Sequence, residues 1–229
     1  MIVDPPVLTI RANFPRPPRK TVDGFVGAPT GNVVDAMGGG GAIDYRIKPL
    51  EPVSKVMVGV ALTCNAGPSD NLALFGALSV AKPGDILVAA TGGYAGAAVT
   101  GDLLLGMARN RGIVGFVTDG MVRDIVGILG VGLPVYCVGV TPNSPARNGP
   151  GTVGEPIDLG GVRIESGDIL IGDRDGVVVV PRGKAAAVLK TLADVRTAEA
   201  AFEEKVKGGL EIPDFILAIL ASNRVHNIE

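Results

Sequence analysis

Three charged residues, Asp102, Arg123 and Asp124, follow predicted strands and are the residues best suited to chemistry. Asp102 begins a predicted helix after a glycine-rich connection, while Arg123 and Asp124 follow a β-branched run that ends at Asp119 and Gly120. In open α/β sheets, ligands bind where strands end at their carboxyl edge. These residues therefore indicate a ligand site, although a salt-bridged surface turn remains an alternative because Arg and Asp are mostly exposed.

The types of these side chains indicate which ligand the site would bind. Two carboxylates close together repel unless a cation lies between them. With no Cys or His nearby, the ligands would be oxygen atoms, which favours Mg²⁺ or Mn²⁺. Arg123 offers a fork for a carboxylate or a developing oxyanion. The free amides of Asp102, Leu103 and Leu104 at the helix start also suit a small carboxylate.

Several other kinds of site are disfavoured by the sequence. The glycine-rich stretch 91–101 lacks the Gly-Lys-Ser/Thr ending of a P-loop and the spacing of a dinucleotide fingerprint. His226 is the one histidine, which excludes a His-rich zinc site and argues against a Ser-His-Asp or Cys-His triad. Cys64 and Cys137 lie in apolar surroundings and are predicted to be buried free thiols.

The composition of the chain limits the kinds of partner that the protein would bind. The chain has 229 residues and a net charge of -2, so no basic surface for nucleic acid or anionic membrane is expected. No apolar run approaches the roughly 18 residues of a spanning helix, and the first residues do not resemble a signal peptide. We therefore expect a globular cytoplasmic protein without nucleic-acid or membrane partners.

The elements that would position the charged residues form a β-α-β unit. Residues 86–90, 102–110 and 113–118 read as strand, helix and strand, with the two strands parallel. Residues 135–140 are predicted as another strand, and Ser69 as the cap of a helix that extends through Leu78. Residues 158–180 read as short antiparallel strands and residues 184–207 as a long helix.

The two ends of the chain differ from its middle. Residues 1–20 contain five prolines and four basic residues, so residues 1–24 are predicted as an extended arm that is not packed, and is either disordered or placed on a neighbouring subunit. Residues 25–210 would form the main domain. Residues 211–229, with an apolar final helix over 212–220, would pack at a subunit interface.

Two motifs resemble a known family. Thr100-Gly-Asp-Leu-Leu104 and Arg111-Gly-Ile-Val-Gly-Phe-Val-Thr-Asp-Gly-Met-Val-Arg-Asp124 are similar to the signature of class II 4-hydroxy-4-methyl-2-oxoglutarate aldolases, which share a superfamily with the regulator of ribonuclease activity A. The resemblance covers about residues 25–210. It implies an α/β fold, namely a three-layer β/β/α swivelling-type domain with a parallel β-α-β core and a C-terminal helical extension. It also implies a homotrimer or homohexamer and a divalent-metal site for pyruvate.

The resemblance also implies roles for individual residues. The counterpart of Asp124 binds the metal directly, that of Asp102 acts through a water molecule, and that of Arg123 binds the pyruvyl group. The substrate carboxylate would be held by the backbone at Gly101, Leu103 and Leu104. In some members a glutamate from a neighbouring subunit completes the site. Glu199 on the long helix is the candidate, although it could instead belong to a solvated helix face.

These features predict a Mg²⁺- or Mn²⁺-dependent pyruvate aldolase that cleaves 4-hydroxy-2-oxo diacids. The same enolate would allow oxaloacetate decarboxylation. With no histidine as base, a water held by Asp102 is the simplest proton carrier. A non-catalytic regulator that binds an RNA-degrading enzyme is the alternative, and another lyase or hydrolase on the same scaffold is a third reading. The residues that select the distal half of the substrate are not identified by the sequence.

Overall fold

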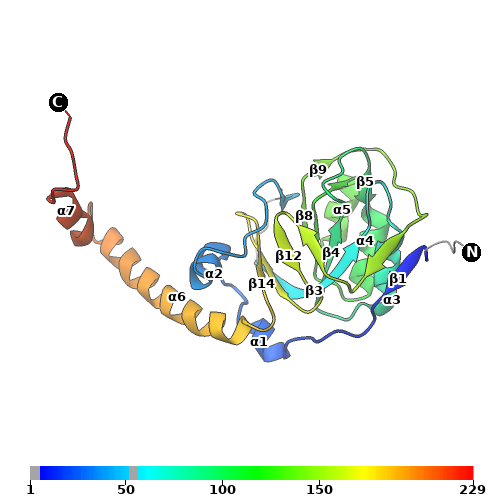
Figure 1. Ribbon diagram of the computed structural model, residues 1–229, viewed down its shortest axis with the longest axis horizontal. Coiled ribbons are helices and arrows are strands. Elements are labelled where there is room, and N and C mark those ends of the chain that lie inside the picture. Colours follow the sequence, from blue (N-terminus) through cyan, green and yellow to red (C-terminus); the bar gives the residue numbers. More distant parts are fainter. Residues whose placement is uncertain (1–5, 52–55, 229) are drawn as a thin grey trace, which may run out of the picture.

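The computed structural model describes residues 6–51 and 56–228, and a mixed sheet forms its centre (Figure 1). In this part of the chain nine strands join in the order β1-β10-β3-β4-β6-β8-β2, with β13 and β14 attached through β3. The strands of this sheet are Leu8–Ile10 (β1), Lys48–Pro49 (β2), Met57–Asn65 (β3), Asp85–Ala90 (β4), Gly115–Thr118 (β6), Val135–Cys137 (β8), Gly151–Val153 (β10), Ile169–Gly172 (β13) and Val177–Val180 (β14).

Two smaller sheets and the helices complete the fold. A three-stranded parallel sheet consists of Ala98–Thr100 (β5), Met121–Val122 (β7) and Gly139–Val140 (β9), and a hairpin of Ile157–Leu159 (β11) and Val162–Ile164 (β12). The helices are Arg19–Asp23 (α1), Thr30–Ala36 (α2), Leu72–Val80 (α3), Asp102–Asn110 (α4), Ile125–Val131 (α5), Ala185–Lys207 (α6) and Asp214–Leu220 (α7).

The central sheet is buried on both faces, which gives three layers. Successive residues of a strand point to opposite faces. Accordingly, Leu87 of β4 joins the cluster that includes α3, α4 and α5, whereas its neighbours Ile86 and Val88 join the cluster beneath the β11–β12 hairpin. Helices α3, α4 and α5 therefore cover one face and the hairpin the other. The predicted α/β class is confirmed, as is a long C-terminal helix.

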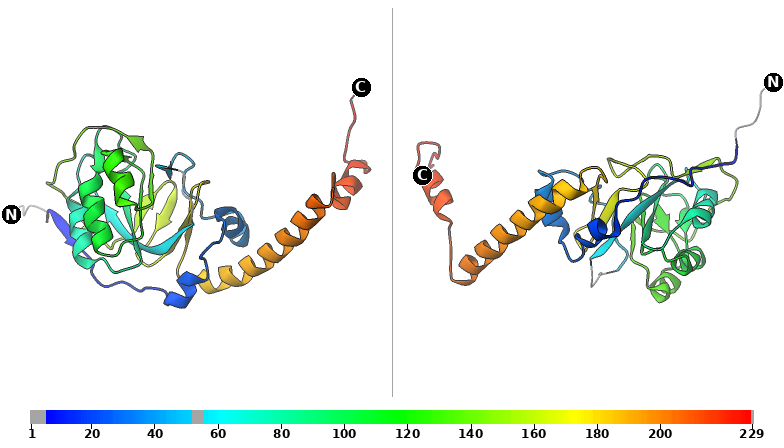
Figure 2. Two further views of the ribbon diagram at one scale, coloured as in Figure 1. Left: turned by 180° about the vertical axis from the view of Figure 1, so that it is seen from behind. Right: turned by 90° about the horizontal axis from the view of Figure 1, so that it is seen from below.

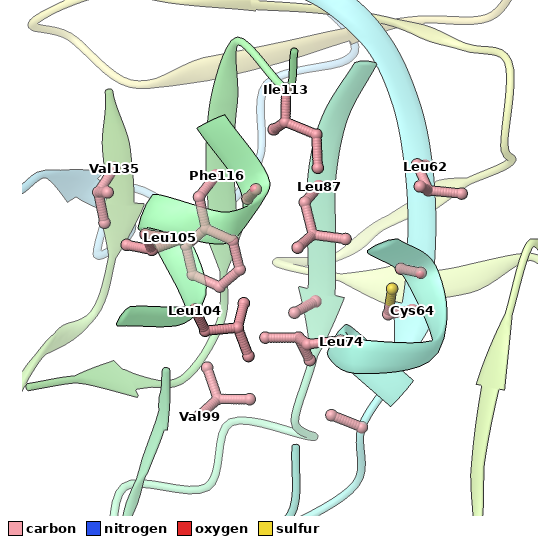
Figure 3. Close-up of a cluster of buried hydrophobic side chains, with 14 of the residues drawn as sticks. Leu62, Cys64, Leu74, Leu87, Val99, Leu104, Leu105, Ile113, Phe116 and Val135 are labelled. Atoms are coloured by element: carbon pink, nitrogen blue, oxygen red, sulfur yellow. The ribbon is translucent and has the colours of Figure 1, made fainter. Parts of the chain in front are cut away.

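The predicted β-α-β unit is present. Strands β4 and β6 pair in parallel, with Ile86 opposite Gly115, and α4 connects them on the helical face. In Figure 3, Leu104 and Leu105 of α4 lie beside Phe116 of β6. Burial of these leucines fixes the first turn of α4 against the sheet, and hence the place where Asp102 stands.

The N-terminal segment differs from its prediction as an unpacked arm. Within the described residues, β1 pairs in parallel with β10, with Leu8 opposite Gly151. Farther along, the Arg16 guanidinium bonds the buried carboxylate of Asp85, with Nη2 2.7 Å from Oδ2. The segment therefore lies along the surface of the domain of its own chain (Figure 2). It is anchored there by the pairing of β1 at the sheet edge, where prolines are tolerated, and by the Arg16–Asp85 ion pair.

The Arg16–Asp85 pair yields a stability prediction. Arg16→Gln should lower the free energy of unfolding by about 1.5–3 kcal/mol, the typical contribution of a hydrogen bond to a charged group. The loss should be visible in urea unfolding at neutral pH. As a control, Arg19→Gln removes a largely exposed i,i+4 pair with Asp23 and should have little effect. Equal stability of the two variants would contradict the anchoring role of Arg16.

Two further local predictions were wrong. Residues 135–140 form two strands, because the chain leaves the central sheet after Cys137 and enters the small parallel sheet at Gly139. Ser69 does not cap α3: the N-cap residue is Asn71, and the side chain that bonds the start of the helix is that of Asp70, whose Oδ1 accepts the Leu72 amide at 2.8 Å. Sequence patterns around Ser69 cannot show which of two adjacent oxygen-bearing side chains faces the helix.

The buried residues of the long helix α6 all lie in its first half. Val188 and Leu192 are buried against the β13–β14 end of the sheet, whereas Phe202 and Val206 near the other end are exposed. The helix projects from the domain and carries α7, which contains no buried residue (Figure 1). The expected packing of the tail against another subunit stays a prediction. No helix in the described ranges is long and apolar enough to cross a membrane.

Candidate active site

The predicted site residues meet because the three strands of the small sheet are parallel. Strand β5 pairs with β7, with Ala98 opposite Met121, and β7 pairs with β9. The segments that follow these strands therefore leave the sheet at the same edge. They are residues 101–102, 123–124 and 141–147. The site is thus built at the carboxyl ends of three strands, the location favoured in α/β folds.

Backbone hydrogen bonds hold the first two segments together. The Arg123 amide donates to the Thr100 carbonyl at 3.1 Å, and the Gly101 carbonyl accepts the Leu105 amide as α4 begins. Asp124 has φ 60° and ψ 45°, a left-handed conformation that is uncommon outside glycine but is tolerated by Asp. This conformation turns the chain directly from β7 into α5.

Arg123 and Asp124 form an ion pair at the mouth of a pocket. Arg123 Nε lies 3.1 Å from Asp124 Oδ2, and the two side chains are 34% and 45% exposed. Arg123 Nη1 also donates to Ser144 Oγ from the segment after β9. The salt bridge expected in the surface-turn alternative is therefore present. It borders a pocket, however, and is not fully exposed to solvent.

Asp102 lies at the start of α4 in the same pocket. Its Oδ1 accepts the Leu103 amide at 2.7 Å. A substrate carboxylate bound to this amide would therefore take the place of the Asp102 carboxylate as acceptor. Two glycines leave room for the acidic side chains: an added Cβ at Gly101 would stand 2.5 Å from Asp124 Oδ2, and one at Gly127 2.2 Å from Asp102 Oδ2.

The pocket brings together every predicted residue except Glu199. Its cavity has a volume of about 140 Å³. Its lining consists of Asn71, Phe75, Thr100, Gly101, Asp102, Leu103, Leu104, Met107, Arg123, Asp124, Pro145 and Arg147. A second, shallower hollow adjoins it through Arg123 and Asp124, and there Val126 is largely exposed.

Glu199 is not among the residues that line the pocket. It lies on α6, where its carboxylate accepts a hydrogen bond from the buried Asn32 of α2. In Figure 1 this part of α6 projects away from α4 and α5. Glu199 therefore does not enter the pocket of its own chain, and its role in the site of another subunit stays a prediction.

The donor set in the pocket fits a hard, hydrated cation. It contains two carboxylates, Asp102 and Asp124, and the described residues contain no group of three or more His, Cys, Asp or Glu side chains arranged for a metal. Mg²⁺ commonly binds through one or two carboxylates and keeps several waters or substrate oxygens. The expectation of Mg²⁺ or Mn²⁺ remains a prediction that this donor set supports.

The thiols and the histidine lie outside the site. Cys64 and Cys137 are free and buried, as predicted. Burial raises the pKa of the Cys64 thiol, and it raises the pKa of Cys137 to about 11, so neither is a thiolate at neutral pH. His226 is exposed in the C-terminal tail. Any proton transfer in the pocket therefore relies on carboxylates or water.

Sequence reasoning did not assign a role to one side of the pocket. We call Asn71, Phe75, Pro145 and Arg147 the distal wall. Asn71 lies within the residues 25–210 covered by the family resemblance, but no role was predicted for it. Arg147 lies in the connection between the strands predicted over residues 135–140 and 158–180. Its position depends on pairing between residues far apart in the sequence, so no local pattern could have identified it.

The close approach of Gly127 to Asp102 gives a prediction for the site. Gly127→Ala should lower the rate of the predicted pyruvate release about 10- to 100-fold, because the new methyl group displaces the Asp102 carboxylate. The measurement is steady-state kinetics alongside thermal unfolding. Gly130→Ala is the matched control, since Gly130 lies in the same helix with nothing within 4 Å of its added Cβ. Comparable activity in the two variants would contradict this role of Gly127.

The fold and site define an α/β domain of a known family. The chain matches the RraA-like family model, described as Aldolase/RraA, over residues 30–179. This match covers more than half of the chain, which therefore belongs to the RraA-like (Aldolase/RraA) family. The resemblance noted in the sequence is confirmed. The predicted domain limits at residues 25 and 210 stay predictions.

Individual relatives support the same assignment. Over 182 residues the chain is 40% identical to a Halalkalibacterium halodurans protein named "Putative 4-hydroxy-4-methyl-2-oxoglutarate aldolase", with 78% of this chain and 86% of that protein covered. A Streptomyces coelicolor structure, described as an unusual member of the RNase ES inhibitor RraA protein family, matches with a TM-score of 0.75 and 27% identity, over 83% of this chain and 99% of that one. The RNA-processing inhibitor RraA from Thermus thermophilis gives a TM-score of 0.62 at 27% identity, covering 67% and 93% of the two chains.

Proposed function

We propose that the protein is a divalent-metal-dependent pyruvate aldolase that cleaves 4-hydroxy-2-oxo diacids, and that it also decarboxylates oxaloacetate. The observation that supports this most directly is the convergence of Arg123, Asp124 and Asp102 in one pocket at the start of α4. The guanidinium of Arg123, the carboxylates of Asp102 and Asp124 and the free amides at the start of α4 are together suited to binding a 2-oxo acid. The aldolase name of the relative at 40% identity agrees with this proposal.

The residues would bind the pyruvyl half of the substrate as follows. The substrate carboxylate accepts hydrogen bonds from the Leu103 and Leu104 amides at the positive end of α4. Arg123 donates to the 2-oxo oxygen. Asp124 would hold Mg²⁺ or Mn²⁺ directly, and Asp102 would hold it through a water molecule. When bound, the metal would polarise the 2-oxo group as a Lewis acid.

Cleavage would follow from charge stabilisation at the 2-oxo oxygen. The 4-hydroxyl loses its proton to water held by Asp102, the C3–C4 electron pair moves into the pyruvate enolate, and the distal fragment leaves as a carbonyl compound. Arg123 lies where the negative charge of the enolate develops. Return of a proton to C3 completes pyruvate. Oxaloacetate reaches the same enolate by loss of carbon dioxide, so one site serves both reactions.

A coupled assay with lactate dehydrogenase tests this function. With Mg²⁺ or Mn²⁺ present, pyruvate should be released from 4-hydroxy-4-methyl-2-oxoglutarate or oxaloacetate, and EDTA should abolish the release. Oxalate, a planar mimic of the pyruvate enolate, should inhibit far more strongly than acetate. Absence of metal-dependent pyruvate across a panel of such acids would refute the proposal.

The proposal includes a shared site in an oligomer. Val126 and Ile125 form an exposed apolar rim beside Asp124, and the projecting part of α6 exposes Phe202. Apolar surface of this kind is typical of subunit interfaces. We propose that a second chain covers the rim, in a homotrimer or hexamer, and brings Glu199 to the pocket. Light scattering that shows a single chain per particle at micromolar concentration would contradict this.

A non-catalytic regulator is the second candidate. Two structural neighbours are described as members or examples of the RraA inhibitor family. Such a role would use an outer surface to bind an RNA-degrading enzyme and would not need Arg123 or Asp124. Co-purification with a ribonuclease, combined with no pyruvate release, would favour the regulator over the aldolase.

A further inference from the structure

The guanidinium of Arg123 is bonded to a side chain that the proposed mechanism does not use. Arg123 Nη1 donates a hydrogen bond to Ser144 Oγ, which belongs to the segment after β9. We propose that Ser144 is a positioning residue, which holds Arg123 in the orientation that binds the 2-oxo oxygen of the substrate. This inference rests on the proposed function and extends it to a residue that does not touch the substrate.

The contacts of Arg123 define both the position and the rotation of its planar group. Nε lies 3.1 Å from Asp124 Oδ2, and Nη1 is bonded to Ser144 Oγ. A guanidinium has five N–H donors. With one engaged at Nε and one at Nη1, three are left for a ligand. Two contacts at different nitrogen atoms hold the plane of the group more firmly than one contact would.

Ser144 would act on a ligand through Arg123. Of the residues that the structure describes, the pocket lining includes Arg123 and Pro145 but not Ser144. The Ser144 hydroxyl therefore has no direct place in the reaction. Its effect on the chemistry would be the placement of the arginine, and removal of Arg123 should remove that effect as well.

Backbone hydrogen bonds fix the segment that carries Ser144. On one side, the Ala98 amide donates to the Asn143 carbonyl at 3.0 Å. On the other side, the Ala146 amide donates to the Ser69 carbonyl at 2.7 Å. The Ser144 hydroxyl is thus offered from a backbone that is anchored at both ends, although the residue itself is exposed. A group that is held in advance loses less freedom when a ligand binds.

Ser144 differs in charge from the other partner of Arg123. Asp124 is a carboxylate that is proposed to bind the metal, so its ion pair with Arg123 competes with metal binding. If Asp124 turned toward the metal, Arg123 would keep the contact with Ser144. The hydroxyl is neutral and accepts a hydrogen bond without offsetting the positive charge of the guanidinium. That charge is what would stabilise the enolate.

The first test separates kcat from KM. Ser144→Ala should lower kcat for pyruvate release about 5- to 20-fold and change KM less than about threefold, because a misplaced donor weakens binding of the transition state more than that of the substrate. Ser144→Thr keeps the hydroxyl group and should retain nearly full activity. Threonine is compatible with the extended backbone expected before Pro145. Ser79→Ala is the matched control, since it removes a serine hydroxyl that bonds the Gly76 carbonyl within α3, and kcat should be unchanged.

The second test measures binding without turnover. In the presence of Mn²⁺, isothermal titration calorimetry should show about 10-fold weaker binding of oxalate to Ser144→Ala than to wild type, because Arg123 is no longer held against this mimic of the enolate. The affinity for Mn²⁺ without oxalate should be unchanged, since Ser144 is not proposed to hold the metal. In Arg123→Ala protein, the additional Ser144→Ala substitution should cause no further loss of oxalate affinity, as expected for two residues that act as one unit.

The outcomes separate this inference from the proposed function. If wild-type protein releases pyruvate, the role of Ser144 would be overturned by an unchanged kcat in Ser144→Ala, by equal losses in Ser144→Ala and Ser144→Thr, or by a further loss in the double variant. A loss of activity that accompanies a lower unfolding temperature would also overturn it, because it would indicate general damage. Failure of wild-type protein both to release pyruvate and to bind oxalate would refute the proposed function and this inference with it.

Discussion

Replacing Arg123 with alanine should lower kcat for pyruvate release by about 10²–10³-fold, the typical loss when a donor to a developing oxyanion is removed. The effect would arise because Arg123, which lies 3.1 Å from Asp124, is proposed to donate to the oxygen on which the enolate charge develops. Folding should be preserved, since the side chain is one third exposed and lies outside the hydrophobic clusters. Steady-state kinetics and thermal unfolding, measured on the same preparation, check both statements.

Two comparisons make the Arg123 result specific. Arg123→Lys keeps the charge but loses the fork, so its activity should fall between those of wild type and Arg123→Ala. Arg163→Ala removes an exposed arginine elsewhere and should leave kcat unchanged. Full activity in Arg123→Ala would exclude Arg123 from the mechanism and would favour the regulator.

Asp124→Asn should weaken Mn²⁺ binding in the presence of oxalate by at least about 100-fold, and more than Asp102→Asn does. The difference follows because Asp124 is proposed to touch the metal, whereas Asp102 acts through water, and losses from such indirect partners are typically 10–100-fold. Isothermal titration calorimetry measures the affinities directly and does not depend on turnover. Equal and negligible effects of the two substitutions would mean that the metal binds elsewhere.

The parts of the site that could be predicted are those encoded by local patterns. The apolar runs 86–90 and 113–118 are long enough to be recognised as buried strands, and the helix between them has a clear start at Asp102. Parallel pairing of the two strands then follows from the handedness of such connections. The expectation that Asp102, Arg123 and Asp124 lie at one edge of the fold followed from this pairing, and the three residues do line one pocket.

The rest depends on contacts between distant segments. Strands β5, β7 and β9 have only two or three residues each, too short for a periodic pattern, yet their parallel pairing builds the site. The N-terminal segment was wrongly predicted because its many prolines obscure the short strand β1 and the arginines Arg11 and Arg16, which anchor it through ion pairs. Arg147 is likewise placed by Asp70, which lies more than seventy residues earlier in the sequence.

The separate origins of the two sides of the pocket have a consequence for how such an enzyme changes over time. Residues 101–104 and 123–124, which would perform the chemistry, follow β5 and β7, whereas residues 71, 75 and 147 belong to α3 and to the loop tied to its start. Substitutions at the distal wall therefore need not disturb the reacting groups. We expect new substrate preferences to evolve there by single substitutions, with the reaction itself inherited unchanged.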